Sequence, residues 1–172
     1  MEALECMLTR SSVKKYKSDP VPKELMDKII EAGLAAPSGL NKQAAIILAV
    51  TDKQVRDELS AINAGKDPFK RPDPFYNAPC VLVVLADKSV FTSIYDGTLV
   101  MENMMLAAHA LGLGACWIHR AKETFEQPEW KAFLKKLGIE GEYEGIGNCV
   151  VGYPEGEVPA VKPRKEGRVY YV

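Results

Sequence analysis

The first residues that could do chemistry lie close to the N-terminus. Arg10, Ser11, Ser12 and Lys14 bring a guanidinium, two hydroxyls and an ammonium into one short stretch. Arg offers parallel N–H donors, the hydroxyls add neutral donors and Lys adds a point charge, a combination that suits a phosphate group. A solvated basic turn would have the same composition. The cluster therefore indicates either a phosphate site or an ordinary basic turn.

A second candidate is the turn that contains Pro37, Ser38, Gly39 and Asn41. Small and amide-bearing residues after a helix let the backbone approach a flat ring closely. The same residues also suit a simple helix end and turn.

A third candidate lies near the C-terminus, where Lys162 and Arg164 flank Pro163. Proline restricts the backbone and would hold both cations on an extended segment. A solvated charged tail is the alternative interpretation of this motif.

Several common catalytic motifs are missing from the sequence. It has no G-x-x-x-x-G-K-[ST] phosphate loop and no G-x-S-x-G nucleophile turn. Gly112 and Gly114 begin like a dinucleotide fingerprint, but Trp117 replaces the last glycine and the segment leads into a predicted strand. No side-chain acid, base or nucleophile stands out, and no metal site is expected. A bound cofactor is then the expected carrier of the chemistry.

Length and composition limit the class of protein. The 172 residues are expected to form one domain, residues 1–172, and the 47% apolar composition is that of an ordinary globular protein. The net charge of −1 argues against a general nucleic-acid binder. The longest apolar run, residues 78–86, is too short to span a membrane, and the acidic N-terminus does not resemble a signal peptide. We therefore expect a cytoplasmic protein without nucleic-acid or membrane partners.

Four scattered cysteines, Cys6, Cys80, Cys116 and Cys149, form no C-x-x-C pair. We expect them to be buried thiols that pack as small hydrophobic side chains.

Apolar patterning predicts alternating helices and strands. Helices are expected at about 22–36, 54–61, 93–111 and 128–137, and strands at 44–50, 80–86, 115–118 and 144–151. The loop 63–77 contains prolines and aromatic residues, and would either cap the core or form a lid over a planar ligand. Residues 153–172 have no apolar period and are expected to form an extended arm that lies on another surface.

In chain order, five segments resemble motifs of the nitroreductase family, the FMN-dependent NAD(P)H oxidoreductases. The resemblance covers almost the whole chain. The segments are 10–16 (RSSVKKY), 36–43 (APSGLNKQ), the helical stretch 96–114, 114–118 (GACWI), and 152–154 (GYP) with the two tail cations.

The resemblance implies an α+β, nitroreductase-like fold with a central mixed β-sheet flanked by helices. It also implies a homodimer with an extended C-terminal arm and two FMN sites at the subunit interface. Lys14 would lie near the pyrimidine side of the flavin. The remaining cofactor-binding residues are expected to be Arg10, Ser11, Ser12, Lys162 and Arg164 at the phosphate, Pro37, Ser38, Gly39 and Asn41 reaching across the interface, and Ala115, Cys116, Trp117 and Ile118 along the flavin.

The function implied by the resemblance is hydride transfer from NADH or NADPH, through flavin N5, to a nitroaromatic, quinone or enone-type small-molecule acceptor. No side chain is expected to be catalytic, although the charge of Lys14 could tune the flavin. The alternatives are a specialised relative (a reductive dehalogenase, a flavin-consuming enzyme or an azoline dehydrogenase) and a non-catalytic FMN-binding module. Ala44, Ala45 and His119 depart from the family pattern and leave the shape of the substrate pocket open.

Overall fold

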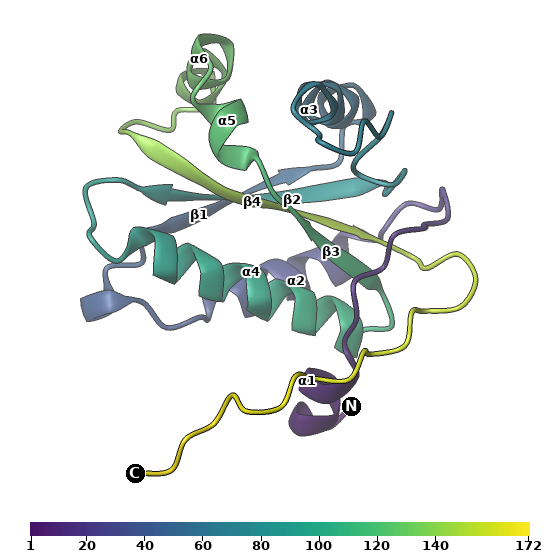
Figure 1. Ribbon diagram of the computed structural model, residues 1–172. Helices are drawn as coiled ribbons and strands as arrows, with labels where there is room; N and C mark the ends of the chain where they lie inside the picture. Colours follow the sequence, from purple (N-terminus) through teal and green to yellow (C-terminus); the bar gives the residue numbers. More distant parts are fainter.

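A four-stranded antiparallel sheet forms the middle layer of the protein (Figure 1). The computed structural model describes residues 1–172. The strands are β1 (Ala45–Val50), β2 (Cys80–Asp87), β3 (Gly114–Ile118) and β4 (Tyr143–Gly152), in the order β1-β2-β4-β3. All named strands pair antiparallel, and the parallel character expected of a mixed sheet is confined to the bridge between Ser12 and Ala115. The α+β class is confirmed.

Helices cover both faces of the sheet (Figure 1). Helices α2 (Lys23–Leu34) and α4 (Ser93–Ala110) pack on one face, and α3 (Lys53–Gly65), α5 (Ala121–Phe125) and α6 (Pro128–Lys136) lie on the other. The sequence did not predict the short helix α1 (Ala3–Thr9), the 3₁₀ turn η1 (Gly39–Asn41) or α5. Each is at most two turns long, too short to display an apolar period.

Strand β2 shows why its sequence is continuously apolar. Leu82 and Val84 belong to the core beneath α2 and α4, whereas Val81 and Val83 belong to the core beneath α3, α5 and α6. All four side chains are fully buried. Because successive residues of a strand point to opposite faces, a strand covered on both sides needs no polar positions.

The segment after α1 runs along the free edge of β3. The Val13 N–H donates to the Ala115 carbonyl at 3.1 Å, and the Lys17 N–H donates to the Tyr153 carbonyl at 2.9 Å. A side chain at Gly114 would lie 2.8 Å from the Val13 side chain, so glycine permits this close approach. These contacts fix the backbone that carries Arg10 to Lys14.

The loop that follows α3 caps the core, and its role as a lid stays a prediction. Phe75 is fully buried in the core, as expected of a connector that caps it. Phe69, by contrast, is 77% exposed. The loop therefore has one anchoring aromatic side chain and one that remains open to a neighbour.

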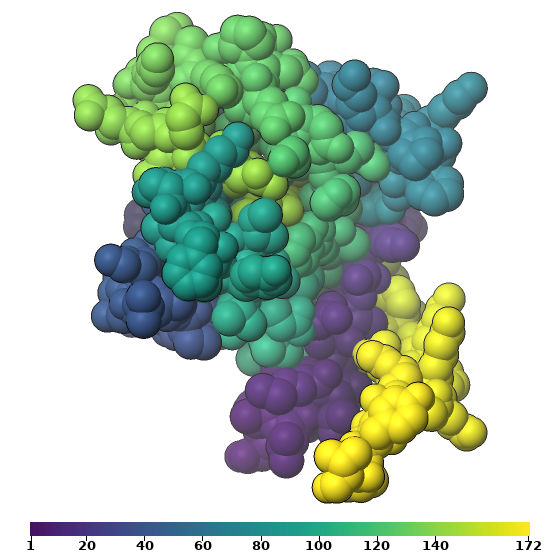
Figure 2. Space-filling view, turned by 60° about the vertical axis from the view of Figure 1, so that its left-hand side comes forward, coloured from purple at the N-terminus to yellow at the C-terminus, as the bar shows by residue number.

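The chain beyond Gly152 contains no helix or strand, and nearly all of its residues are exposed. Figures 1 and 2 show the C-terminal residues running past α1 and away from the sheet. No helix in the structure combines the length and the apolar character needed to cross a bilayer.

Candidate functional site

A cleft of about 350 Å³ lies between a segment near the N-terminus and a segment near the C-terminus. Its walls come from the segment after α1 and from the tail beyond β4. The residues lining it are Arg10, Ser11, Ser12, Lys14, Pro159, Ala160, Val161, Lys162 and Arg164. The cleft thus brings together the five side chains expected at a phosphate, together with Lys14.

Two polar atoms in this cleft are buried without a hydrogen-bond partner: Nη1 of Arg10 and Oγ of Ser11. Burying a donor without an acceptor is unfavourable, so such atoms indicate a missing ligand. An anionic oxygen would satisfy both. The donors present, a guanidinium and a hydroxyl, fit the phosphate monoester of FMN.

The electrostatics of the cleft also favour an anion. Arg10 has one carboxylate neighbour, since its Nε lies 3.5 Å from an oxygen of Glu102. Lys14, Lys162 and Arg164 are exposed and take part in no ion pair. Four positive charges therefore face one negative charge, and this positive excess attracts an anion such as a phosphate.

Strand β3 lies directly beside the cleft. Ala115 bridges to Ser12, and the Cys116 thiol is close enough to Ser12 and Lys14 to be influenced by both. Burial raises the pKa of Cys116, and the neighbouring Ser12 hydroxyl and the charges of Lys14 and Arg10 lower it in part. Trp117 is half-buried and Ile118 is buried, and neither lines the cleft. None of the four residues of the predicted strand segment lines the cleft, and Ala115 is tied to it only through the bridge to Ser12.

The turn predicted to reach a flavin lies elsewhere in the single chain. Pro37 and Ser38 line a separate cavity of about 140 Å³ with Gln43 and Asp96. The Gly39 N–H donates to a carboxylate oxygen of Asp96 at 3.0 Å, which ties the turn to the start of α4. Figure 2 shows this turn (dark blue) beside the start of α4 (teal).

The backbone of this turn is unusual. Leu40 and Asn41 adopt φ values of 52° and 54°, and the carbonyl oxygen of the Asn41 side chain accepts a hydrogen bond from Gln43 at 3.2 Å. Consecutive non-glycine residues with positive φ are uncommon. The turn is therefore a specifically shaped surface that shares no residue with the phosphate-like cleft.

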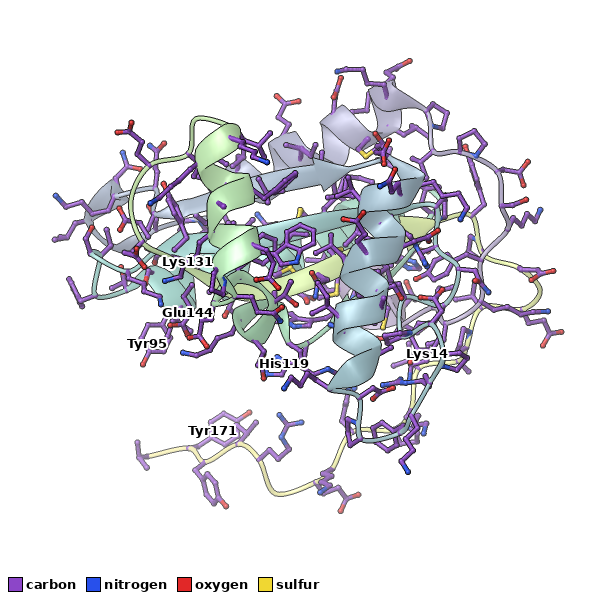
Figure 3. The ribbon with its side chains drawn as sticks, turned by 90° about the horizontal axis from the view of Figure 1, so that it is seen from above. Lys14, Tyr95, His119, Lys131, Glu144 and Tyr171 are labelled. Carbon is purple, nitrogen blue, oxygen red and sulfur yellow. The ribbon has the colours of Figure 1, made fainter.

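Sequence reasoning missed two groups around the cleft. The first is Glu102, a residue of α4 that reaches Arg10. The second is the pair Asp67 and Arg71 in the loop after α3, joined at 2.6 Å. Seen from above, Lys14 lies on the side of the molecule where this loop runs (Figure 3), but no residue of the loop lines the cleft. The four-residue spacing of Asp67 and Arg71 was the available signal, but outside a helix that spacing does not predict contact.

Comparison with known proteins agrees with the fold. The model of the nitroreductase family matches residues 7–153. A relative from Methanothermobacter thermautotrophicus, whose name includes NAD(P)H nitroreductase, is 31% identical over 121 residues, which cover 68% of this chain and 60% of the relative. The NADPH-flavin oxidoreductase of Vibrio harveyi is 28% identical over 177 residues, covering 96% of this chain and 71% of the relative.

Among solved structures, a nitroreductase with bound FMN from Bacteroides fragilis superimposes with a TM-score of 0.89 at 29% identity. The superposition covers 100% of this chain and 99% of that chain. The resemblance inferred from five short motifs is thereby confirmed over most of the sequence. The chain belongs to the nitroreductase family.

Proposed function

We propose that this protein is an FMN-dependent NAD(P)H oxidoreductase that reduces a nitroaromatic, quinone or enone-type small molecule. The observation that carries the proposal is the cleft in which the buried Arg10 Nη1 and Ser11 Oγ lack partners while Lys162 and Arg164 lie opposite. The names of related proteins, including NADPH-flavin oxidoreductase and FMN reductase, support the same activity.

The role of the chain's own residues is to bind and orient the cofactor. Arg10, Ser11 and Arg164 hold the phosphate with charge-assisted hydrogen bonds. Lys14 keeps a positive charge beside the ring, where it favours negative charge on the flavin. FMN held in this cleft would supply the redox chemistry, which is hydride transfer between the nicotinamide and the acceptor.

A complete site requires two copies of the chain in this proposal. The turn 37–41 and the phosphate-like cleft lie apart in one chain, so a partner's turn would supply the second wall. Exposed apolar side chains on α1, on α4 and at the C-terminus support association; they include Leu4, Leu8, Ile94, Tyr95, Tyr170 and Tyr171. Exposed large apolar side chains that gather in this way are typical of a protein interface.

The test begins with the purified protein. It should be yellow, or become yellow with added FMN, and denaturation should release FMN and no FAD, as chromatography of the flavin will show. Anaerobic addition of NADH or NADPH should bleach the flavin, and a screen of oxidants should restore its colour. Protein that cannot be loaded with FMN would contradict the proposal. Bound FMN that neither nicotinamide reduces would indicate a flavin-binding module instead.

A further inference from the structure

A groove of about 430 Å³ runs between α3 and α6. Figure 1 shows both helices on the face of the sheet away from α2 and α4. The groove shares no residue with the phosphate-like cleft. Its volume falls in the range of small-molecule sites, roughly 300–1,000 Å³. Each helix contributes four lining residues: Val55, Glu58, Ala61 and Ile62 from α3, and Glu129, Trp130, Phe133 and Lys136 from α6.

The spacing of the lining residues shows that each helix turns one side toward the groove. On both helices they recur every three or four positions, and residues at that spacing share one face of a helix. The one polar side-chain contact of α6 runs from Lys131 to Glu142, which lies outside α3. No side-chain hydrogen bond or ion pair therefore ties the two helices together across the groove.

The α6 wall of the groove is aromatic and rigidly held. The ring centroid of Trp130 lies 5.4 Å from that of Phe125 and 5.2 Å from that of Phe133, and both pairs are edge-to-face. Phe125 is fully buried and Trp130 is 6% exposed, so the indole is anchored in the core. Val55, Ile62 and Phe133 pack against the same core but stay half-buried. The groove therefore offers a preformed apolar and aromatic surface.

The charges beside this surface are predominantly negative. Glu58 and Glu129 are exposed, lie on different helices and form no ion pair within the chain. Glu58 accepts one hydrogen bond, from Gln54 Nε2 at 3.0 Å. Lys136 is the one cation of the lining, and it lies about 10 Å from Glu129 along the helix axis. The two carboxylates are thus available to a cation from outside the chain.

We propose that the groove between α3 and α6 binds an organic cation with an aromatic body, such as an arylalkylamine. The aromatic body packs on Trp130 and Phe133, and the ammonium group lies between Glu58 and Glu129. A neutral or anionic molecule of the same shape binds less tightly, because it gains nothing from the two carboxylates. The proposal goes beyond the proposed function, since binding in this groove requires neither hydride transfer nor turnover.

The two tryptophans of the chain allow a direct test by NMR. Trp130 lines the groove, whereas Trp117 packs against the core on the other side of the sheet, so its indole N–H signal is an internal control. FMN-loaded, ¹⁵N-labelled protein is titrated with phenethylamine, 2-phenylethanol and 3-phenylpropionate, and Trp130→Phe assigns the signals. Phenethylamine should shift the Trp130 signal alone, with a dissociation constant of about 1 mM, as expected for a fragment. The alcohol and the carboxylate should bind at least about 5-fold more weakly.

Substitutions in the groove separate the contribution of charge from that of shape. The double variant Glu58→Gln/Glu129→Gln should weaken phenethylamine binding about 5-fold, as expected for two exposed ion pairs, and leave the alcohol within about twofold. Glu123→Gln is the matched control, because it removes an exposed carboxylate of α5 that does not line the groove. Ala61→Phe adds a ring at an exposed lining position and should abolish binding of every probe.

Several results would overturn the proposal. These are equal binding of the amine and the alcohol, tighter binding of the carboxylate, equal shifts of both indole signals, and binding that survives Ala61→Phe. An equal loss in the double variant and in Glu123→Gln would reduce the effect to general surface charge. A Trp130 signal that moves with protein concentration and with no probe would show that a second copy of the chain covers the groove, and would also overturn the proposal. The readout does not depend on activity, so failure of the proposed function would leave this result unchanged.

Discussion

At the scale of single residues, the most informative atoms are the buried donors without partners. Arg10 Nη1 and Ser11 Oγ are enclosed by protein but satisfied by none of it. An unsatisfied buried donor costs roughly 1–3 kcal/mol. A fold retains that cost where a ligand removes it. Arg164 lines the same cleft, as a phosphate contact would and a solvated tail residue would not.

Arg164→Ala should weaken FMN binding while leaving the protein folded. Loss of a charge-assisted hydrogen bond costs about 1.5–3 kcal/mol, or roughly 10- to 150-fold in affinity, and the exposure of Arg164 favours the lower end. Arg168→Ala is the control, since Arg168 lies on the same tail but does not line the cleft. Fluorescence quenching during titration of the apoprotein with FMN measures both. Equal affinities for the two variants would remove the tail from the phosphate site.

The buried Cys80 thiol should make the free energy of unfolding depend on pH in the alkaline range. Burial raises the pKa of its thiol to about 12, compared with about 8.5 in an unfolded chain. The folded state holds the thiol proton more tightly than the unfolded chain does. The resulting contribution of Cys80 to the free energy of unfolding is therefore complete below about pH 8.5 and is lost as pH rises toward 12. Between pH 8 and pH 10 the loss should be about 2 kcal/mol.

Cys80→Ala should therefore reduce the fall in unfolding free energy between these two pH values by about 2 kcal/mol. Val81→Ala is a suitable control, because it shortens a neighbouring buried side chain without removing a titratable group. Urea unfolding under reducing conditions at fixed protein concentration gives both values. An identical pH dependence in wild type and Cys80→Ala would show that the thiol does not titrate as its burial requires.

At the scale of elements, the sequence predicted what is long and apolar. Strands β2 and β4 and helix α4 were recognised because burial leaves a clear apolar pattern. The short helices α1 and α5 were not predicted, because a helix of two turns or fewer displays no recognisable apolar periodicity. The two halves of the cleft were each visible as motifs. Their meeting depends on long-range pairings, such as that between the Glu155 N–H and the Lys15 carbonyl, which no local pattern contains.

The packing of α5 on β4 gives a prediction at this scale. A Cβ added at Gly145 would lie 2.5 Å from the Lys122 nitrogen and still closer to the Ala121 carbonyl. Backbone atoms cannot rotate away as a side chain can, so Gly145→Ala should destabilise the fold by about 3 kcal/mol.

Gly65→Ala provides the opposite case, because Gly65 ends α3 with nothing within 4 Å of an added Cβ. Alanine should stabilise that helical position by about 0.5–1 kcal/mol. Chemical denaturation of both variants beside the wild type checks the pair. Gly145→Ala as stable as wild type would mean that α5 can move off the sheet at little cost.

At the scale of the whole molecule, α4 is apolar on more than the side it buries. Met101 and Met104 face the sheet and are fully buried, whereas Ile94, Tyr95 and Leu99 remain exposed. A helix that is hydrophobic over most of its circumference is normally covered on all sides. In one chain nothing covers this second face. The exposed apolar side chains at the C-terminus, Val169 to Val172, are likewise uncovered.

We therefore expect a homodimer, with a mass by light scattering of about twice the 18.9 kDa of the chain at low micromolar concentration. The interface should exceed about 2,000 Å², as in permanent assemblies. Leu99→Glu should shift the equilibrium toward monomer and weaken FMN binding together, because a charge would be buried at the contact that completes the site. Leu137→Glu is the matched control, since Leu137 is also exposed but directly follows α6, which lies on the opposite face of the sheet. A wild-type mass near that of one chain, or FMN binding that survives dissociation unchanged, would contradict a site built from two copies.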